Sequence, residues 1–207
     1  MNTLTALTFV TALLTTGGPY PLDETSREVP TRGKLRCDRG SMERYAGDTV
    51  PYHSKVTVHP AFRERLQRFE KIVKAVAVEV YGRTPRRTVH IGTYNCRRIR
   101  GYPNLMSEHA LGNAIDVAGF DFGPLPRGAT APDKPSKRHH RAFKVRMKRH
   151  WDATGRDGRH ARFLRTVAKR TIAADIFRVL LGPAWPGHDD HFHFDMAPYR
   201  VVAIFED

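Results

Sequence analysis

The segment GHDDHFHFD, at residues 187–195, restricts the fold of this chain more than any other stretch. Polar and apolar side chains alternate between residues 190 and 196, which is the pattern of a strand with one buried face. On such a strand His191, His193 and Asp195 share the polar face. Because the apolar face would lie in the core, we expect the two histidines to face a cleft and to be held rigidly by the sheet.

A second polar segment, SEHALGNAID at residues 107–116, lies much earlier in the chain and contains His109 and Asp116. Residues 114–122, AIDVAGFDF, predict a strand that carries Asp116. Gly112 stands between the two polar residues and permits a turn there. We therefore expect Asp116 on a strand, with His109 brought close to it across the turn.

Neutral imidazole and carboxylate groups are the usual ligands of zinc, and a catalytic zinc takes three protein ligands while keeping one position for water. His109, Asp116 and one of the two late histidines would provide such a set. The residues alone do not choose between His191 and His193, because both lie on the same face of the expected strand. The alternative is a group of hydrogen-bonded core histidines. We favour a metal because several buried imidazoles are costly without partners.

The motifs SEHxxxNAxDxAGF and HxDHFHxD together resemble the extensin-like C-terminal domain family of bacteria. That family is in turn similar to the zinc peptidases of the lysostaphin and D-alanyl-D-alanine metallopeptidase group, whose signature is HxxxxxxD…HxH. The resemblance covers most of the chain and is strongest between Gly92 and Pro198. It implies that one zinc ion is held by His109, Asp116 and His193 in a cleft on the sheet.

The resemblance also implies catalytic roles for three further residues. Asp190 would be the general base, and His191 would stabilise the tetrahedral intermediate or share the acid–base role. Arg97 would orient the substrate or its oxyanion, with a solvated surface arginine as the alternative. Supporting roles beside the metal ligands are expected for His188, Ser107 and Asp195. Direct contact with the metal is the alternative for His188, and Glu108 is expected at the surface.

Two apolar stripes at helical spacing predict helices, one starting at residue 60 and one spanning residues 160–181. Gly82 would end the first helix and Gly182 the second. Strands are expected at residues 88–94, 114–122, 190–196 and 199–205. Helix-flanked strands in this order predict an α+β domain with a small, mostly antiparallel sheet.

Cys37 and Cys96 make an even count of cysteines, which suggests one disulfide in an exported chain. The extensin-like family has cysteines at similar places, which favours the bridge over two free thiols. Residues 4–14 resemble the apolar part of a signal peptide, although no basic residue precedes them. We therefore expect a signal-type segment and linker at residues 1–33, one domain at residues 34–207, and a periplasmic or secreted protein.

The formal net charge of +14 predicts an anionic partner. Residues 134–149 are strongly basic and contain no acidic residue, which indicates a solvated or flexible face. Nucleic acid is disfavoured because few aromatic residues that could stack on bases interrupt this run. Anionic polymers of the cell envelope are the expected partners, and no apolar run is long enough to anchor the chain across a bilayer.

These observations lead to the hypothesis of a monomeric, zinc-dependent peptidase that cleaves peptide bonds in peptidoglycan. One alternative is a cell-wall-binding module that keeps the metal site without catalysis. It would predict a lost ligand or base, yet all of those residues are present. The other alternative, a basic nucleic-acid-binding protein, would predict recognisable binding motifs, and we find none in the sequence.

Overall fold

The computed structural model describes residues 19–129 and 140–206. The strands of its central sheet are β3 (Arg87–Gly92), β6 (Ala114–Phe122), β7 (Phe143–Arg146), β8 (Val179–Leu181), β9 (Phe192–Asp195) and β10 (Val201–Ala203). They form a six-stranded sheet in the order β10-β8-β9-β6-β3, with β7 also paired to β6. All of these pairs are antiparallel except β10 with β8. The protein is therefore α+β, as the sequence predicts.

The helices are α1 (Pro60–Tyr81), α2 (Met147–His150) and α3 (Gly158–Ala173). The first helix begins where the sequence predicts, because the His59 ring accepts a hydrogen bond from the Ala61 amide at 3.2 Å. It ends at Gly82, whose φ of 69° is a left-handed conformation that glycine adopts without strain. The apolar stripe of α1 is buried along its whole length.

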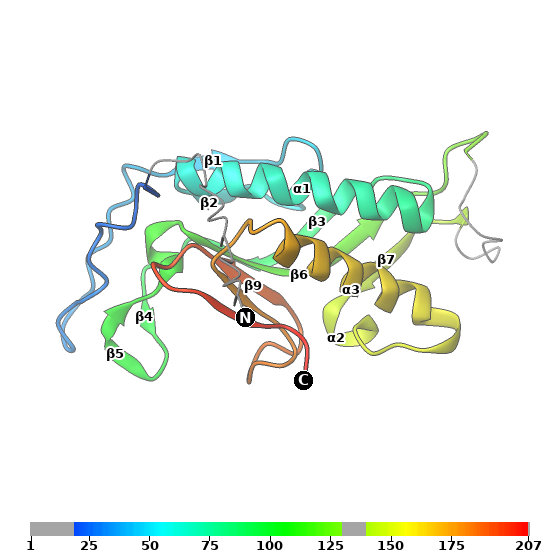
Figure 1. The fold of residues 1–207 in the computed structure, drawn as a ribbon. Helices are drawn as coiled ribbons and strands as arrows, with labels where there is room; N and C mark the ends of the chain where they lie inside the picture. Colours follow the sequence, from blue (N-terminus) through cyan, green and yellow to red (C-terminus); the bar gives the residue numbers. More distant parts are fainter. Residues whose placement is uncertain (1–18, 130–139, 207) are drawn as a thin grey trace, which may run out of the picture.

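Helices α1 and α3 contact each other and share one hydrophobic core with the sheet (Figure 1). Side chains of β6 and β9 alternate between the two faces of the sheet. Asp116 lies between Ile115 and Val117, which are both fully buried in that core. His193 likewise lies between two fully buried phenylalanines. The two polar side chains therefore point to the face of the sheet away from the helices.

Strand β6 organises the sheet because two different strands share one of its edges. Residues 116–121 of β6 are paired with β3 on one side. On the other side, residues 114–117 pair with β9 and residues 119–122 pair with β7. The short helix α2 directly follows β7, and the loop of residues 182–191 leads into β9. The helix and the loop consequently meet beside the middle of β6.

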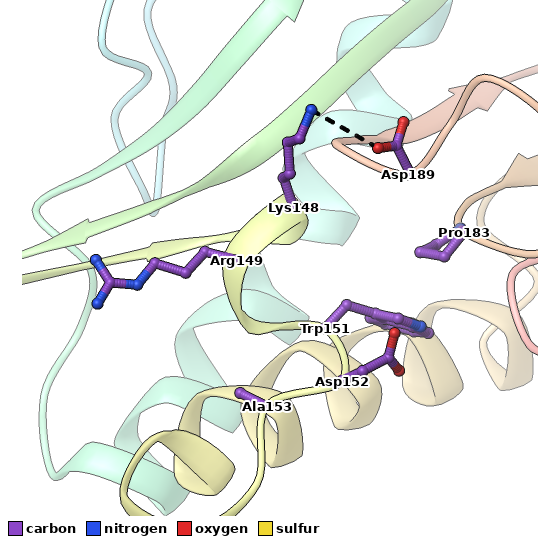
Figure 2. A pocket seen from close by; sticks show the side chains of 7 residues that line it. All are labelled: Lys148, Arg149, Trp151, Asp152, Ala153, Pro183 and Asp189. Atoms are coloured by element: carbon purple, nitrogen blue, oxygen red, sulfur yellow. Dashed lines mark ion pairs between the residues drawn. The ribbon is translucent and has the colours of Figure 1, made fainter.

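A pocket of about 330 Å³ opens where α2 meets this loop (Figure 2). Trp151 and Pro183 lie on one side of it. Lys148 points toward Asp189, with 3.9 Å between the ammonium nitrogen and the nearest carboxylate oxygen. One wall of the pocket is therefore the same loop that carries His191.

The second helix is shorter than the predicted span of residues 160–181. It ends at Ala173, and Asp175 has a φ of 47°, which breaks the helical path. The apolar residues beyond it, such as Phe177, are buried from irregular backbone, and Val179–Leu181 forms strand β8. These residues keep the spacing of the helical stripe, although their backbone is not helical. The last strand is also shorter than predicted, with β10 limited to Val201–Ala203.

The second half of the basic run does present a solvated basic face, as predicted, but its backbone forms regular structure that the sequence did not predict. Residues 134–139 lie outside the described part of the chain, but residues 143–150 form β7 and α2. Val145 and Met147 are fully buried, while Lys148 and Arg149 are exposed. The excess of basic residues masks an alternation of apolar and basic side chains that is typical of a strand.

The expected linker packs against the domain. Tyr20 is buried, and the Arg178 guanidinium forms an ion pair with Asp23. Residues 1–18, which include the expected signal-type segment, lie outside the described residues. Among the residues that the structure does describe, we find no helix with the length and apolar character needed to span a bilayer.

Smaller elements surround the sheet. Two antiparallel pairs join β1 (Glu43–Tyr45) with β2 (Val56–Val58) and β4 (Arg98–Ile99) with β5 (Tyr102–Met106). Short 3₁₀ helices are η1 (Glu108–Leu111) and η3 (Gly155–Asp157). The predicted disulfide is confirmed: Cys37 and Cys96 are bonded, and the bridge connects the N-terminal segment to the loop between β3 and β4.

Candidate metal centre

Three residues converge on one point at the face of the sheet away from the helices. His109, Asp116 and His193 each offer one ligand atom, and these atoms lie within 4.8 Å of one another. Asp116 stands between the two rings. One of its carboxylate oxygens lies 3.3 Å from His109 Nε2 and the other lies 2.9 Å from His193 Nδ1. The spacing of two imidazoles and one carboxylate is that of a potential three-ligand metal site.

Strand pairing brings Asp116 and His193 together. The two residues are direct partners in the antiparallel register of β6 and β9, so their side chains lie side by side on one face. On the other edge of β6, Asp116 pairs with Gly92 of β3. A Cβ atom at Gly92 would lie 2.4 Å from the Asp116 Oδ2 atom. Glycine at this position therefore leaves the space that the carboxylate occupies.

His109 reaches the cluster from the η1 turn just before β6. The Ser107 hydroxyl accepts a hydrogen bond from the His109 amide at 3.3 Å and so caps the start of this turn. The chain then reverses at Gly112, with a φ of 62°. His109 Nδ1 lies 2.5 Å from the Thr93 carbonyl oxygen, which can only accept. Nδ1 therefore carries the proton, and the lone pair is on Nε2.

The Nε2 atom of His109 is buried, and no hydrogen-bond partner reaches it within the described part of the chain. The group it faces is a carboxylate oxygen of Asp116 at 3.3 Å. Two electron-rich atoms this close repel each other unless a cation or a proton lies between them, and leaving a buried polar atom unpaired is costly. A bound metal would satisfy both atoms.

The ring of His193 is held on both sides by carboxylates. Nδ1 lies 2.9 Å from Asp116, and Nε2 lies 2.7 Å from Asp195. Asp195 is itself buried and accepts a hydrogen bond from the Ala197 amide at 2.9 Å. Burial lowers the pKa of His193, but the hydrogen bonds to the two carboxylates outweigh it and raise the pKa to about 9.

The cluster fits a zinc ion. Each imidazole has one nitrogen directed at the centre, while its other nitrogen is held by an oxygen acceptor: the Thr93 carbonyl for His109 and the Asp195 carboxylate for His193. This arrangement, in which an outer oxygen fixes the tautomer and orientation of each ring, is usual for histidines that bind metals. Two imidazoles and one carboxylate also make the donor set of many catalytic zinc sites.

Comparison with known protein families gave a match to part of this chain. The model of the family described as extensin-like protein C-terminus matches residues 23–125. This segment belongs to the extensin-like family. The match includes both cysteines, His109 and Asp116, whereas His193 lies beyond it. No curated protein and no solved structure matched the chain.

The structure places two more histidines beside the cluster. His191 Nε2 lies 3.7 Å from Asp116, and its Nδ1 lies 2.6 Å from a carboxylate oxygen of Asp190. The ring of His188 lies 4.8 Å from that of His191 and 5.9 Å from that of His193, measured between centroids. Burial is the main cause that lowers the pKa of His188.

Two of the predicted catalytic residues have contacts that differ from the expected ones. The Asp190 carboxylate is half-exposed and contacts Nδ1 of His191. It therefore lies on the side of the His191 ring opposite to the nitrogen that faces Asp116. Arg97 is exposed, and its guanidinium donates to the carbonyl of Arg98 at 3.3 Å. Its own carbonyl accepts from the Ser107 amide at 3.1 Å. Arg97 therefore lies next to the turn that carries His109.

Glu108 is not the surface carboxylate that the sequence suggests. It is 6% exposed and receives two hydrogen bonds from Arg27, at 2.8 and 3.2 Å. The Asn113 amide donates to the same carboxylate at 2.5 Å, and Tyr20 donates to the Asn113 carbonyl. This buried network ties the N-terminal segment to the η1 turn. Arg27 and Tyr20 are far away from Glu108 in the chain, so no local pattern indicates these contacts.

Thr93 and Gly92 are the other residues that sequence reasoning missed. Thr93 acts through its backbone carbonyl, which leaves no trace in its residue type. Gly92 does carry a signal, because a glycine inside a predicted strand often marks a close approach of another group. Here that group is the Asp116 carboxylate.

Proposed function

We propose that this protein is a zinc-dependent peptidase that hydrolyses peptide bonds in peptidoglycan. The observation that carries the proposal is the convergence of His109 Nε2, the Asp116 carboxylate and His193 Nδ1, with the second nitrogen of each ring held by an oxygen. Zinc in such a site lowers the pKa of bound water to about 7 and polarises a carbonyl group. Those three residues would hold the ion.

His191 is the residue that we assign to proton transfer. Its Nδ1 is held by Asp190 at 2.6 Å, which leaves Nε2 facing the cluster, 3.7 Å from Asp116. A histidine held in this way can take a proton at Nε2 and return it to the leaving amine. Asp190 then orients the ring, in place of the direct role as base that the resemblance implies.

His188 and Arg97 are proposed to contact the substrate. His188 lies on the loop before β9, beside the rings of His191 and His193. Arg97 is exposed next to the turn of His109. The pocket of about 330 Å³ along the same loop has room for part of a peptide, since ligand pockets begin near 300 Å³.

The choice of peptidoglycan rests on the resemblance to zinc peptidases of cell walls and on the basic charge. A net charge of +14 would concentrate the protein on an anionic envelope. The Cys37–Cys96 disulfide supports a site of action in an oxidising compartment, the periplasm or the cell exterior. Both properties favour the cell wall over a cytoplasmic substrate.

The test is incubation of the purified protein with muropeptides, followed by mass spectrometry of the products. We expect new amine ends that vanish with a chelator, return with zinc, and are absent for His193→Ala. His140→Ala removes an exposed histidine outside the cluster and serves as the matched control, with unchanged products expected. Intact muropeptides together with bound zinc would contradict the peptidase and favour the wall-binding module.

A further inference from the structure

The disulfide-bonded loop between β3 and β4 is joined to the turn of His109 by three hydrogen bonds. The Thr93 carbonyl lies 2.5 Å from His109 Nδ1, and the Asn95 amide donates to the His109 carbonyl at 3.1 Å. The Arg97 carbonyl accepts from the Ser107 amide at 3.1 Å. Residues 93, 95 and 97 thus hold both the backbone and the ring of this ligand.

Beyond these hydrogen bonds and that from the Thr57 amide to the Thr93 hydroxyl at 3.5 Å, the loop is held on its outer side, where Cys96 is bonded to Cys37. Residues 95–97 are exposed, so the hydrophobic core contributes little to their position. On the outside, the Arg98 guanidinium donates to the Pro30 carbonyl at 3.1 and 2.6 Å, and Arg39 lies 5.5 Å from the centre of the Tyr94 ring. Exposed polar contacts of this kind are individually weak. The bond from Cys96 to Cys37 is the one covalent tie of the loop to the N-terminal segment.

We propose that the Cys37–Cys96 disulfide positions the metal ligand His109. This inference rests on the metal site of the proposed function and does not depend on the peptidase activity. The bridge holds the loop so that the Thr93 carbonyl keeps the proton of His109 on Nδ1. Nε2 is then always the atom with a lone pair, and it is always aimed at Asp116. The cysteines act on the site through the loop and through His109 without touching the metal.

Loss of the bridge is expected to weaken zinc binding while leaving the sheet intact. Without it the loop samples other positions, the Thr93 carbonyl leaves Nδ1 for part of the time, and both tautomers of His109 become populated. Removing an outer partner of a ligating histidine typically lowers metal affinity about 10–100-fold. We expect a loss in this range.

The experiment compares the wild-type chain with Cys37→Ser/Cys96→Ser, in which no thiolate can compete for zinc. Zinc affinity is measured by competition with a chromophoric chelator. The tautomer of His109 is read in the metal-free protein from the nitrogen chemical shifts of its ring. Leu66→Ala, a fully buried position in α1, is the matched control that loses stability with the bridge intact.

The predicted result is a 10–100-fold weaker zinc affinity and a mixed tautomer for the double serine variant, with wild-type values for Leu66→Ala. Unchanged affinity with an unchanged Nδ1–H tautomer would overturn the proposal, and so would an equal loss of affinity in Leu66→Ala. Neither readout needs substrate. A protein that binds zinc in this way but cleaves no muropeptide would contradict the proposed activity and leave the positioning role standing.

A second perturbation covers the case in which the serine variant does not fold. A trialkylphosphine reduces the bridge in the folded protein: with one water it becomes the phosphine oxide, and the two sulfurs become thiols. The His109 tautomer is then followed in the metal-free protein while the dispersion of the remaining signals reports on the fold. A folded, reduced protein that keeps the single Nδ1–H tautomer would contradict the proposal.

Discussion

Asp116 lies among three histidines and against a glycine, and each neighbour restricts it differently. His109 and His193 contact its two oxygens, and His191 Nε2 lies 3.7 Å away. Gly92 leaves room for the carboxylate on the remaining side. At the scale of single residues, the site therefore depends on one carboxylate whose position is set by the space around it as much as by its partners.

Gly92→Ala is predicted to weaken zinc binding by at least about 10-fold, the range seen when the surroundings of a ligand are disturbed. The added methyl would lie 2.4 Å from Asp116 Oδ2, so the carboxylate must move. Gly123→Ala is the matched control, because a methyl there meets no atom within 4 Å. Chelator competition measures both affinities, and equal values for the two variants would show that the space beside Asp116 has no role.

Asp195→Asn is predicted to lower zinc affinity about 10-fold without unfolding the protein. The carboxylate accepts from the His193 ring and from the Ala197 amide, and an asparagine has one oxygen for these two donors. Asp189→Asn is the control, since that carboxylate is exposed on the neighbouring loop. Titration calorimetry with zinc gives the comparison. A wild-type affinity for Asp195→Asn would remove this residue from the site.

At the scale of elements, the predicted and observed ends of strand β6 are the same residues. The strand is recognisable in the sequence because its apolar side chains have an acidic residue on the other face of the strand and a glycine close by. It also predicts α1, where the apolar stripe and both ends agree. It fails after Ala173, because residues that fill the core from irregular backbone can imitate a helical spacing. A sequence pattern indicates which side chains are buried. It indicates the backbone conformation as well only when the pattern continues over a long stretch of chain.

In the candidate site, too, the sequence predicts some features and misses others. His109, Asp116 and His193 are visible in the sequence as residue types at a known spacing, and Asp195 follows from the alternation of the strand. The roles of Thr93 and Glu108 depend on a backbone carbonyl and on a partner far away in the chain, Arg27. Such long-range contacts have no local signature.

The interactions of Asp121 in the central sheet predict that the stability of the protein depends on pH. It joins three strands, since Arg146 of β7 and Arg87 of β3 donate to its carboxylate at 2.6 and 2.7 Å. Burial raises the pKa of Asp121, but these hydrogen bonds and charges outweigh it and lower the pKa below the ordinary value of 3.8. The contribution to stability is therefore present above pH 4 and is lost as the pH falls through the lowered pKa.

Asp121→Asn is predicted to lose about 1.5–3 kcal/mol of unfolding free energy at pH 7, the scale of hydrogen bonds to charged groups. Its stability should also fall less steeply than that of the wild type between pH 4 and pH 2. Urea unfolding at several pH values measures both effects. Parallel curves for the two proteins across the acidic range would contradict the assignment.

At the scale of the whole molecule, the charge of +14 and the position of the site suggest a division of roles. Charge would bring the protein to an anionic surface, and the cluster would act once it is there. Screening shortens the reach of exposed charges from about 10 Å at 0.1 M salt to about 3 Å at 1 M. The proposed metal ligands are largely buried and should be insensitive to that change.

Binding to anionic cell-wall preparations is accordingly predicted to fall by an order of magnitude or more between 0.1 and 1 M salt, since many exposed charges contribute. His193→Ala should bind the wall as the wild type does. Co-sedimentation with purified sacculi gives both measurements. Binding that is independent of salt would contradict the role of charge, and binding that disappears in His193→Ala would show that retention depends on the proposed metal site.

The most direct measurement is X-ray diffraction at the zinc absorption edge from crystals grown with one equivalent of zinc. We predict one anomalous peak, with His109 Nε2 and His193 Nδ1 at about 2.0–2.1 Å and an Asp116 oxygen at about 2.0–2.2 Å. A saturated protein with no peak within bonding distance of these three groups would contradict the metal site and, with it, the proposed hydrolase.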